Sequence, residues 1–68
     1  MEERTVFIPN ISCNHCAMTI RREVGDIAGV ESVFVDVAAR RATIRWSAPA
    51  DWTTIAAVLD EIGFPPGA

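Results

Sequence analysis

Two cysteines, Cys13 and Cys16, carry the clearest chemical potential in this 68-residue chain, which contains no others. Asn14 and His15 separate them, and this spacing lets both sulfur atoms converge on one point. The thiolate form of cysteine binds metal ions and attacks disulfides. A secreted domain of this size usually carries more bridges, between distant parts of the chain. The close pair therefore indicates metal or redox chemistry in a reducing compartment.

The small number of further ligands favours one class of ion. A structural zinc site normally takes four ligands from cysteine and histidine, whereas this chain offers two cysteines and one histidine, His15. Soft thiolate sulfur selects Cu(I), zinc and similar ions over magnesium or calcium. Because Cu(I) is satisfied by few sulfur ligands, Cys13 and Cys16 predict a Cu(I) site that is open enough to surrender its ion to another protein.

Other interpretations stay open for the same residues. The two thiolates would also bind zinc, cadmium or mercury, and a thioredoxin-type dithiol oxidoreductase uses the same C-x-x-C spacing. Against the oxidoreductase, the chain is short for that fold, and His15 stands where the commonest such motif has proline. A third alternative is a buried or adventitiously oxidised pair. His15 is expected to be a solvated residue that tunes the cysteines, with service as a third ligand as the alternative.

The elements around the pair are predicted to place it at a helix start. Residues 5–8 alternate as a strand does, and Pro9 and Asn10 end that strand. A helix is expected over residues 14–27, because apolar residues recur there on one face: Ala17, Ile20, Val24 and Ile27. Cys13 then lies in the preceding loop and Cys16 in the first helical turn. Free N–H groups and the positive end of the helix dipole stabilise thiolates there.

The remaining chain completes a small α+β domain. Residues 30–37 and 41–46 alternate as strands, Asp51 is a candidate N-cap of a second helix, and Gly63 follows that helix. The order strand, helix, strand, strand, helix predicts a ferredoxin-like βαββαβ two-layer sandwich formed by residues 1–68 as one domain. Pro65 and Pro66 lack the backbone donor, so the last strand is expected to be short or missing.

The segment Asn10-Ile11-Ser12-Cys13-Asn14-His15-Cys16 resembles the Gly-Met-x-Cys-x-x-Cys motif of heavy-metal-associated domains. This family includes bacterial copper chaperones and the N-terminal modules of copper-transporting P-type ATPases. Residues 28–33 are similar to the turn between its first helix and second strand, and residues 55–64 to its second helix. The resemblance therefore covers almost the whole chain.

The resemblance implies a copper chaperone that binds Cu(I) at Cys13 and Cys16. It would deliver the ion to a metal-transporting P-type ATPase or a homologous metal-binding domain. No chemical turnover is implied, so we expect no enzyme. The family's Met is replaced by Ile11, which should pack beneath the metal loop, and its Gly by Asn10, which tolerates positive φ. The ring of Phe64 would cover the loop, with plain core packing as the alternative.

Ser12 precedes the first cysteine, where zinc-handling relatives tend to carry aspartate, and this favours copper. Mercury-handling relatives share much the same motif. A monomer is expected, with a metal-bridged homodimer as an alternative, since two molecules together supply four sulfurs.

Composition and charge exclude several other functions. The net charge of −3 and the isoelectric point near 4.8 argue against nucleic-acid binding, which needs a clustered basic surface. No apolar run approaches the roughly 18 residues of a membrane helix. The start Met1-Glu2-Glu3-Arg4 is unlike a signal peptide, so we expect a cytoplasmic protein. Met18 and the charged residues 21–23 are expected on the surface, with docking as an alternative for 21–23.

Overall fold

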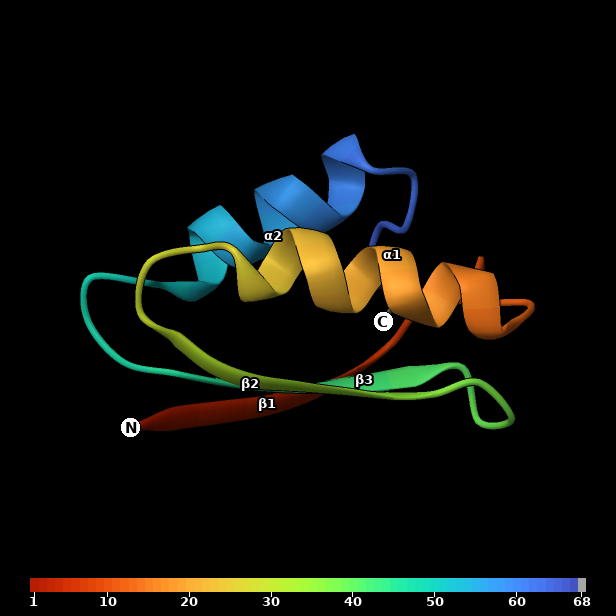
Figure 1. Cartoon of the computed structure of the whole chain (residues 1–68), viewed down its shortest axis with the longest axis horizontal. Helices are drawn as coiled ribbons and strands as arrows, with labels where there is room; N and C mark the ends of the chain where they lie inside the picture. The colour runs from red at the N-terminus through yellow and green to blue at the C-terminus, as the bar shows by residue number, and fades with distance from the viewer. Residues whose placement is uncertain (68) are drawn as a thin grey trace.

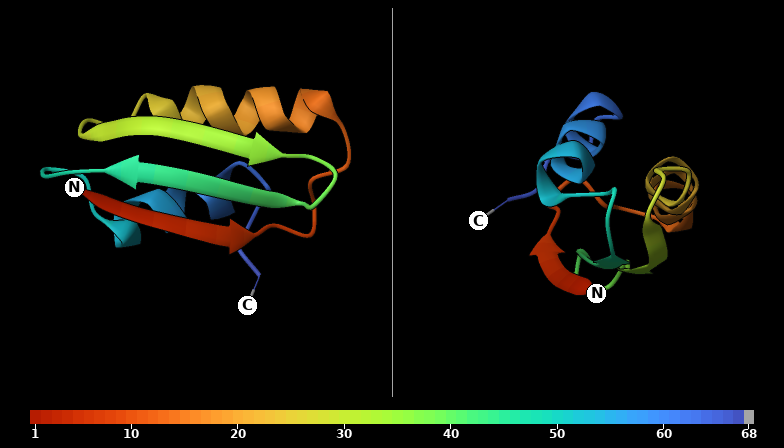
Figure 2. Two further views of the ribbon diagram at one scale, coloured as in Figure 1. Left: turned by 90° about the horizontal axis from the view of Figure 1, so that it is seen from below. Right: turned by 90° about the vertical axis from the view of Figure 1, so that its left-hand side faces the viewer.

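A computed structural model describes residues 1–67. Its elements follow in the order β1 (Glu2–Phe7), α1 (Asn14–Gly25), β2 (Val30–Asp36), β3 (Arg41–Trp46) and α2 (Trp52–Glu61) (Figure 1). The three strands form one antiparallel sheet in the order β1-β3-β2. Both helices cover the same face of that sheet, α1 beside β2 and α2 on the side of β1 (Figure 2). The predicted ferredoxin-like two-layer sandwich is confirmed.

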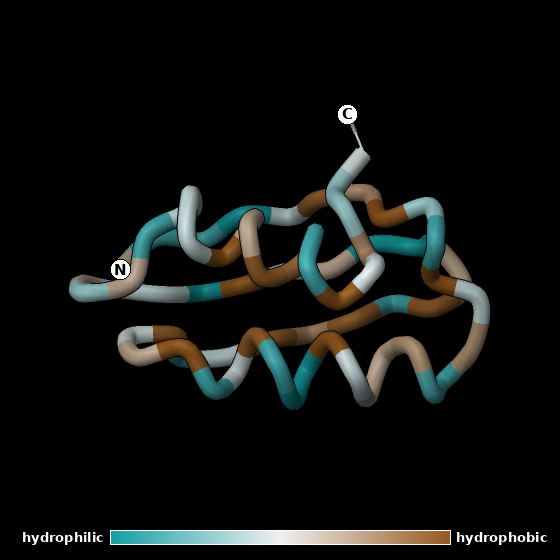
Figure 3. Tube along the Cα trace, turned by 90° about the horizontal axis from the view of Figure 1, so that it is seen from above, coloured by the Kyte–Doolittle hydropathy of each residue, from teal (hydrophilic) through white to brown (hydrophobic). Residues whose placement is uncertain are grey.

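The core lies between the sheet and the two helices, where the alternating pattern of the strands places it. Hydrophobic and hydrophilic positions alternate along strands and helices alike (Figure 3). The buried apolar residues come from both layers and from the loops after β1 and β3: Ile8, Ile11, Ile20, Val24, Ala42, Ile44, Trp46, Ala50, Ile55 and Leu59. Fully burying an Ile or Leu side chain contributes about 1.5–3 kcal/mol. The opposite face of the sheet is exposed, and Phe34 of the edge strand β2, on that face, is 65% exposed.

The two tryptophans join the start of α2 to the sheet. Trp46 is 6% exposed, and its ring centroid lies 5.9 Å from that of half-buried Trp52. The Arg4 guanidinium lies 4.7 Å from the centroid of the Trp52 ring, within cation–π distance. Trp46 is therefore part of the core, and Trp52 packs against the core while staying partly exposed.

The turns around α1 explain where the helix stops. In the structure α1 ends at Gly25 rather than at the predicted Ile27. The Ile27 N–H donates to Val24 O, three residues earlier, at 3.1 Å, instead of to the residue four earlier as in an α-helix. Gly29 then adopts a φ of +97°, and a Cβ at this position would overlap the Ser47 carbonyl oxygen. A side chain cannot be placed there without moving the backbone of the loop after β3, so glycine is required.

The chain after α2 forms no strand within residues 1–67, as the prolines predicted. Gly63 ends the helix with a φ of +90°, as expected of a C′ glycine. The tail then makes a single backbone hydrogen bond to β1, from Gly67 N–H to Phe7 O at 2.6 Å. The outer edge of β1 is otherwise left without a neighbouring strand in the described part of the chain.

Candidate metal centre

The loop between β1 and α1 is anchored from beneath by two isoleucines. Ile8 and Ile11 are both fully buried. The Ile8 N–H donates to Arg40 O at 2.7 Å, and the Ile11 N–H donates back to Ile8 O at 3.1 Å. Ile11 therefore packs under the loop, as expected of the residue in the family's Met position. The rest of the loop is held at the surface with Ser12 and Cys13 exposed.

Asn10 holds this loop through its side chain. It does not adopt a positive φ; within residues 1–67, Arg40 is the only non-glycine residue that does. Instead, the Asn10 Nδ2 donates a hydrogen bond of 2.9 Å to Gly63 O at the end of α2. The tolerance of asparagine for positive φ is therefore not used here, and the side-chain amide, which glycine lacks, ties the loop to the second helix.

Cys13 and Cys16 occupy the start of α1. Cys13 is the N-cap, with extended backbone angles (φ −160°, ψ 174°) and no capping bond from its side chain. Its carbonyl accepts the N–H groups of Cys16 at 3.1 Å and Ala17 at 3.3 Å. Both cysteines are free thiols, Cys13 exposed and Cys16 half-buried. Their sulfur atoms lie 3.7 Å apart, so the structure brings together the two residues that sequence spacing singled out.

Ser12 prepares Cys16 to ionise. Its hydroxyl lies 3.6 Å from the Cys16 sulfur. The pKa of Cys16 falls from 9.0 to about 7, because the backbone of Ser12, its side chain, and then Cys13 provide hydrogen bonds that outweigh the opposing effect of burial. A large share of Cys16 is therefore thiolate at neutral pH. Sequence reasoning used Ser12 only to compare metals and missed this role; the available signal was a hydroxyl directly before the N-cap.

His15 and Phe64 do not complete a larger ligand set. His15 is exposed in the first turn of α1. Within residues 1–67, no three His, Cys, Asp or Glu side chains cluster in a way that could hold a metal ion. Phe64 packs against the core, and its N–H donates to Leu59 O at 2.8 Å. The packing interpretation of Phe64 is thus supported, while its role as a lid over the loop stays a prediction.

The geometry suits a two-sulfur site with open positions. Two metal–sulfur bonds of about 2.3 Å each span at most about 4.6 Å, so sulfurs 3.7 Å apart can both contact one ion. The exposed Cys13 side leaves room for an incoming ligand, and the first-turn N–H groups of α1 favour negative charge on sulfur.

Comparison with known proteins agrees with this fold. The model of the heavy-metal-associated domain matches residues 5–65. The chain belongs to the heavy-metal-associated domain family. This heavy-metal-associated domain is 36% identical to the COP-associated protein of Helicobacter pylori over 59 residues. The aligned segment covers 87% of this chain and 89% of that protein.

Two further matches are a much longer protein and a solved structure. A probable copper-exporting P-type ATPase of Archaeoglobus fulgidus is 36% identical over 63 residues, or 91% of this chain, which spans only 8% of that ATPase. The solution structure of apo-CopP from Helicobacter pylori superposes with a TM-score of 0.88 at 32% identity, covering 97% of this chain and all of that one. In the described residues of this heavy-metal-associated domain, neither helix has the length and apolar character needed to cross a membrane.

Proposed function

We propose that this chain binds one Cu(I) ion through the thiolates of Cys13 and Cys16 and passes it to a partner protein. The observation that carries the proposal is the pair of free sulfur atoms, 3.7 Å apart at the exposed start of α1. The lowered pKa of Cys16 supports it, since metal binding requires deprotonated sulfur. The names of the relatives, copper chaperones and a copper-exporting ATPase, support copper as the ion.

Transfer is a ligand exchange without change of oxidation state. A thiolate of the partner adds at an open position on the ion, one bond from the ion to Cys13 or Cys16 breaks, and the released sulfur leaves as a thiolate, so that charge balances. A second exchange frees the other cysteine. The protein is not an enzyme under this proposal, because the ion is cargo and no covalent substrate is converted.

The partner we propose is a homologous domain of a metal-transporting P-type ATPase in the cytoplasm. The similarity of this chain to a segment of such an ATPase supports this choice, since two domains of one fold can present matching cysteine pairs. A metal-bridged homodimer stays a prediction, in which two molecules share one ion through four sulfurs.

The test is a titration of the reduced protein with Cu(I) against a chromogenic chelator of known affinity. We expect the native protein to take one Cu(I) ion per chain from the chelator. A double variant, Cys13→Ser with Cys16→Ser, should take none. A Met18→Ala variant is the matched control, because Met18 is a soft sulfur side chain that is 65% exposed outside the proposed site. Equal affinity of the double variant would refute the proposal. Competition with zinc, cadmium and mercury then ranks the ions.

A dithiol oxidoreductase is the second candidate, and the Cys16 pKa of about 7 is the observation that favours it. Thioredoxin has a similarly low cysteine pKa of roughly 7. However, the ionised sulfur here belongs to half-buried Cys16, which is poorly placed to attack an external disulfide. We expect no turnover in an insulin-reduction assay. Turnover with a Cys13–Cys16 potential between about −270 and −120 mV would replace the carrier proposal.

A further inference from the structure

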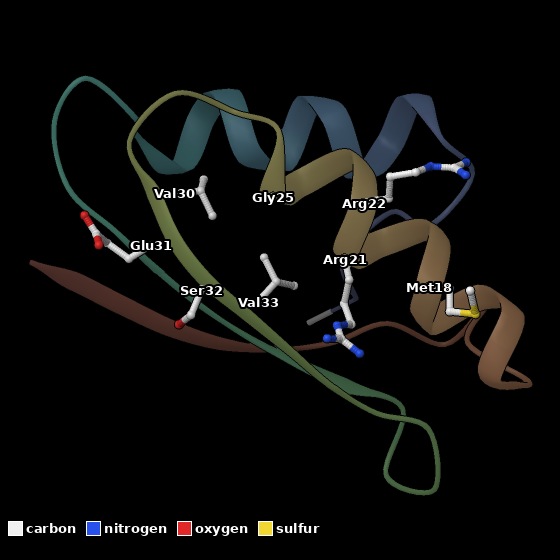
Figure 4. Close-up of a pocket in the computed structure, with 8 residues that line it drawn as sticks. All are labelled: Met18, Arg21, Arg22, Gly25, Val30, Glu31, Ser32 and Val33. Atoms are coloured by element: carbon white, nitrogen blue, oxygen red, sulfur yellow. The ribbon is translucent and has the colours of Figure 1, made fainter.

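A groove of about 530 Å³ runs between α1 and the outer edge of β2 (Figure 4). The wall formed by α1 is one helical stripe, spaced three, one and three residues: Met18, Arg21, Arg22 and Gly25. Val33 of β2 belongs to the opposite wall. The volume lies within the range of ligand sites, roughly 300–1,000 Å³. The groove combines an edge strand with a helix beside it, a geometry in which extended peptides bind by strand addition.

The backbone of β2 is free to accept such a strand. In β3 and the residues that flank it, the N–H and C=O groups of even-numbered residues point toward β1, because the Ile8 N–H donates to Arg40 O. Those of odd-numbered residues point toward β2, because the Ser47 N–H donates to Gly29 O. Because hydrogen bonds alternate along an antiparallel pair, Phe34 opposite Thr43 is bonded to β3. Val33 and Val35 therefore direct their N–H and C=O groups outward, where the described chain offers no strand.

The side chains at this edge do not discourage pairing. Edge strands are commonly protected by charged residues, proline or a covering segment. The β1 edge has such protection, because Glu2, Glu3 and Arg4 lie along it and the tail crosses at Phe7. The middle of β2, residues 32–35, reads Ser-Val-Phe-Val and contains no charge. A strand that adds to this sheet is therefore expected at β2 rather than at β1.

The charge beside the groove selects the occupant. Arg21 extends from α1 toward β2, whereas Arg22 points away from β2 (Figure 4) and its guanidinium lies 3.8 Å from the Glu23 carboxylate. A second copy paired edge to edge would bring its own Arg21 toward this one, which is unfavourable. Glu31 places negative charge at the other end of the groove, where Ser47 Oγ lies 3.4 Å from its carboxylate. Carboxylates of an incoming strand are thus favoured near Arg21.

We propose that the free edge of β2 binds an extended, acidic peptide segment of a partner protein as an added strand. The peptide backbone bonds to Val33 and Val35, and alternate side chains point toward α1. One of these packs on Val33 and Gly25, and the next places a carboxylate at Arg21. This surface is independent of the two cysteines, so the proposal stands or fails separately from metal transfer.

The test uses the reduced, metal-free protein and a capped eight-residue peptide in which threonine alternates with valine and glutamate. We expect amide shifts at Val33 and Val35 in ¹⁵N spectra and slower hydrogen exchange at both. The peptide should bind about tenfold more weakly to Arg21→Glu. Arg41→Glu is the matched control, because Arg41 is exposed on the other face of the sheet and changes the net charge equally.

Four results would overturn the proposal. These are equal affinity for a peptide with lysine in place of glutamate, equal affinity of the Arg21→Glu variant, and shifts confined to β1 or to the loop of Cys13. The fourth is dimer formation in sedimentation velocity with protection of the same amides in the absence of peptide, which would assign the edge to a second copy.

Discussion

The two helices of this protein begin in the same backbone conformation but use their first residues differently. The N-cap Cys13 has φ −160° and ψ 174°, and the N-cap Asp51 has φ −144° and ψ 166°. The Asp51 carboxylate accepts a hydrogen bond of 2.8 Å from the Thr54 N–H, which closes the first turn of α2. The Cys13 sulfur makes no such bond and lies instead 3.7 Å from the Cys16 sulfur.

The difference separates a helix start that stabilises the fold from one that is kept available for chemistry. A capping side chain satisfies one of the N–H groups that a helix start leaves unpaired. In α2 the hydrogen bond from the Thr54 N–H lowers the pKa of Asp51, and this bond occupies the carboxylate. In α1 the lowered pKa belongs to Cys16, whose sulfur stays free to bind an ion. The first helix gives up a stabilising cap in exchange for a reactive sulfur pair.

The largest expected effect comes from making the two helix starts alike. Cys13→Asp supplies α1 with the cap that α2 has and removes one thiolate. Loss of a contact to a metal ligand costs up to about 100-fold in metal affinity. Because Cys13→Asp removes a ligand itself, Cu(I) affinity should fall by more than that. The melting temperature should rise by about 2–6 °C. Competition titration and thermal unfolding measure the two effects, and a variant that is less stable than the native protein would contradict the comparison.

The reverse change removes the cap of α2. Asp51→Ala leaves the Thr54 N–H without its partner and should lower the melting temperature by roughly 4–8 °C. Cu(I) affinity should be unchanged, since Asp51 lies outside the site. Asp60→Ala, at an exposed position later in α2, is the control. An equal loss of stability in both variants would mean that helix propensity, and not capping, explains the result.

The cap should also be visible in the pH dependence of stability. Because the folded-state pKa of Asp51 is lowered by the Thr54 hydrogen bond, its contribution is present above the ordinary aspartate pKa of about 4. It is lost as pH falls through the lower folded-state value. Native protein should therefore lose more stability than Asp51→Ala over this acid range, as measured by urea unfolding. Parallel curves for the two proteins would show that the cap does not titrate.

The smallest effect is expected at Ser12. Thiolate absorbance should report a Cys16 midpoint near pH 7, and apparent metal affinity should increase as pH rises through that midpoint. Ser12→Ala keeps the backbone contribution but removes the hydroxyl 3.6 Å from the sulfur, so the midpoint should rise only part of the way toward 9.0. Ser47→Ala is the control, and an unchanged midpoint in Ser12→Ala would exclude the hydroxyl as a cause.

Local patterns were sufficient for most of the fold. The alternation of residues 41–46 predicted the buried Ala42, Ile44 and Trp46 of β3 without error in its bounds. Asp51 and Gly63 marked the ends of α2, because capping chemistry depends on residues close in sequence. Predicted ends were less accurate where tertiary pairing decides them: β1 begins at Glu2, since its first residues pair with Trp46 and Arg45.

The sequence by itself determined the pair of thiols at a helix start, since the C-x-x-C spacing and the helical period are local properties. Only the tertiary structure decided how that pair is supported. The hydrogen bond from Asn10 to Gly63 joins residues 53 positions apart, and the bond from the Ile8 N–H to Arg40 O fixes the start of the same loop against the end of the β2–β3 turn. The unprotected edge of β2 likewise follows from the strand order β1-β3-β2. Such features rest on contacts between distant residues, which local periodicity does not encode.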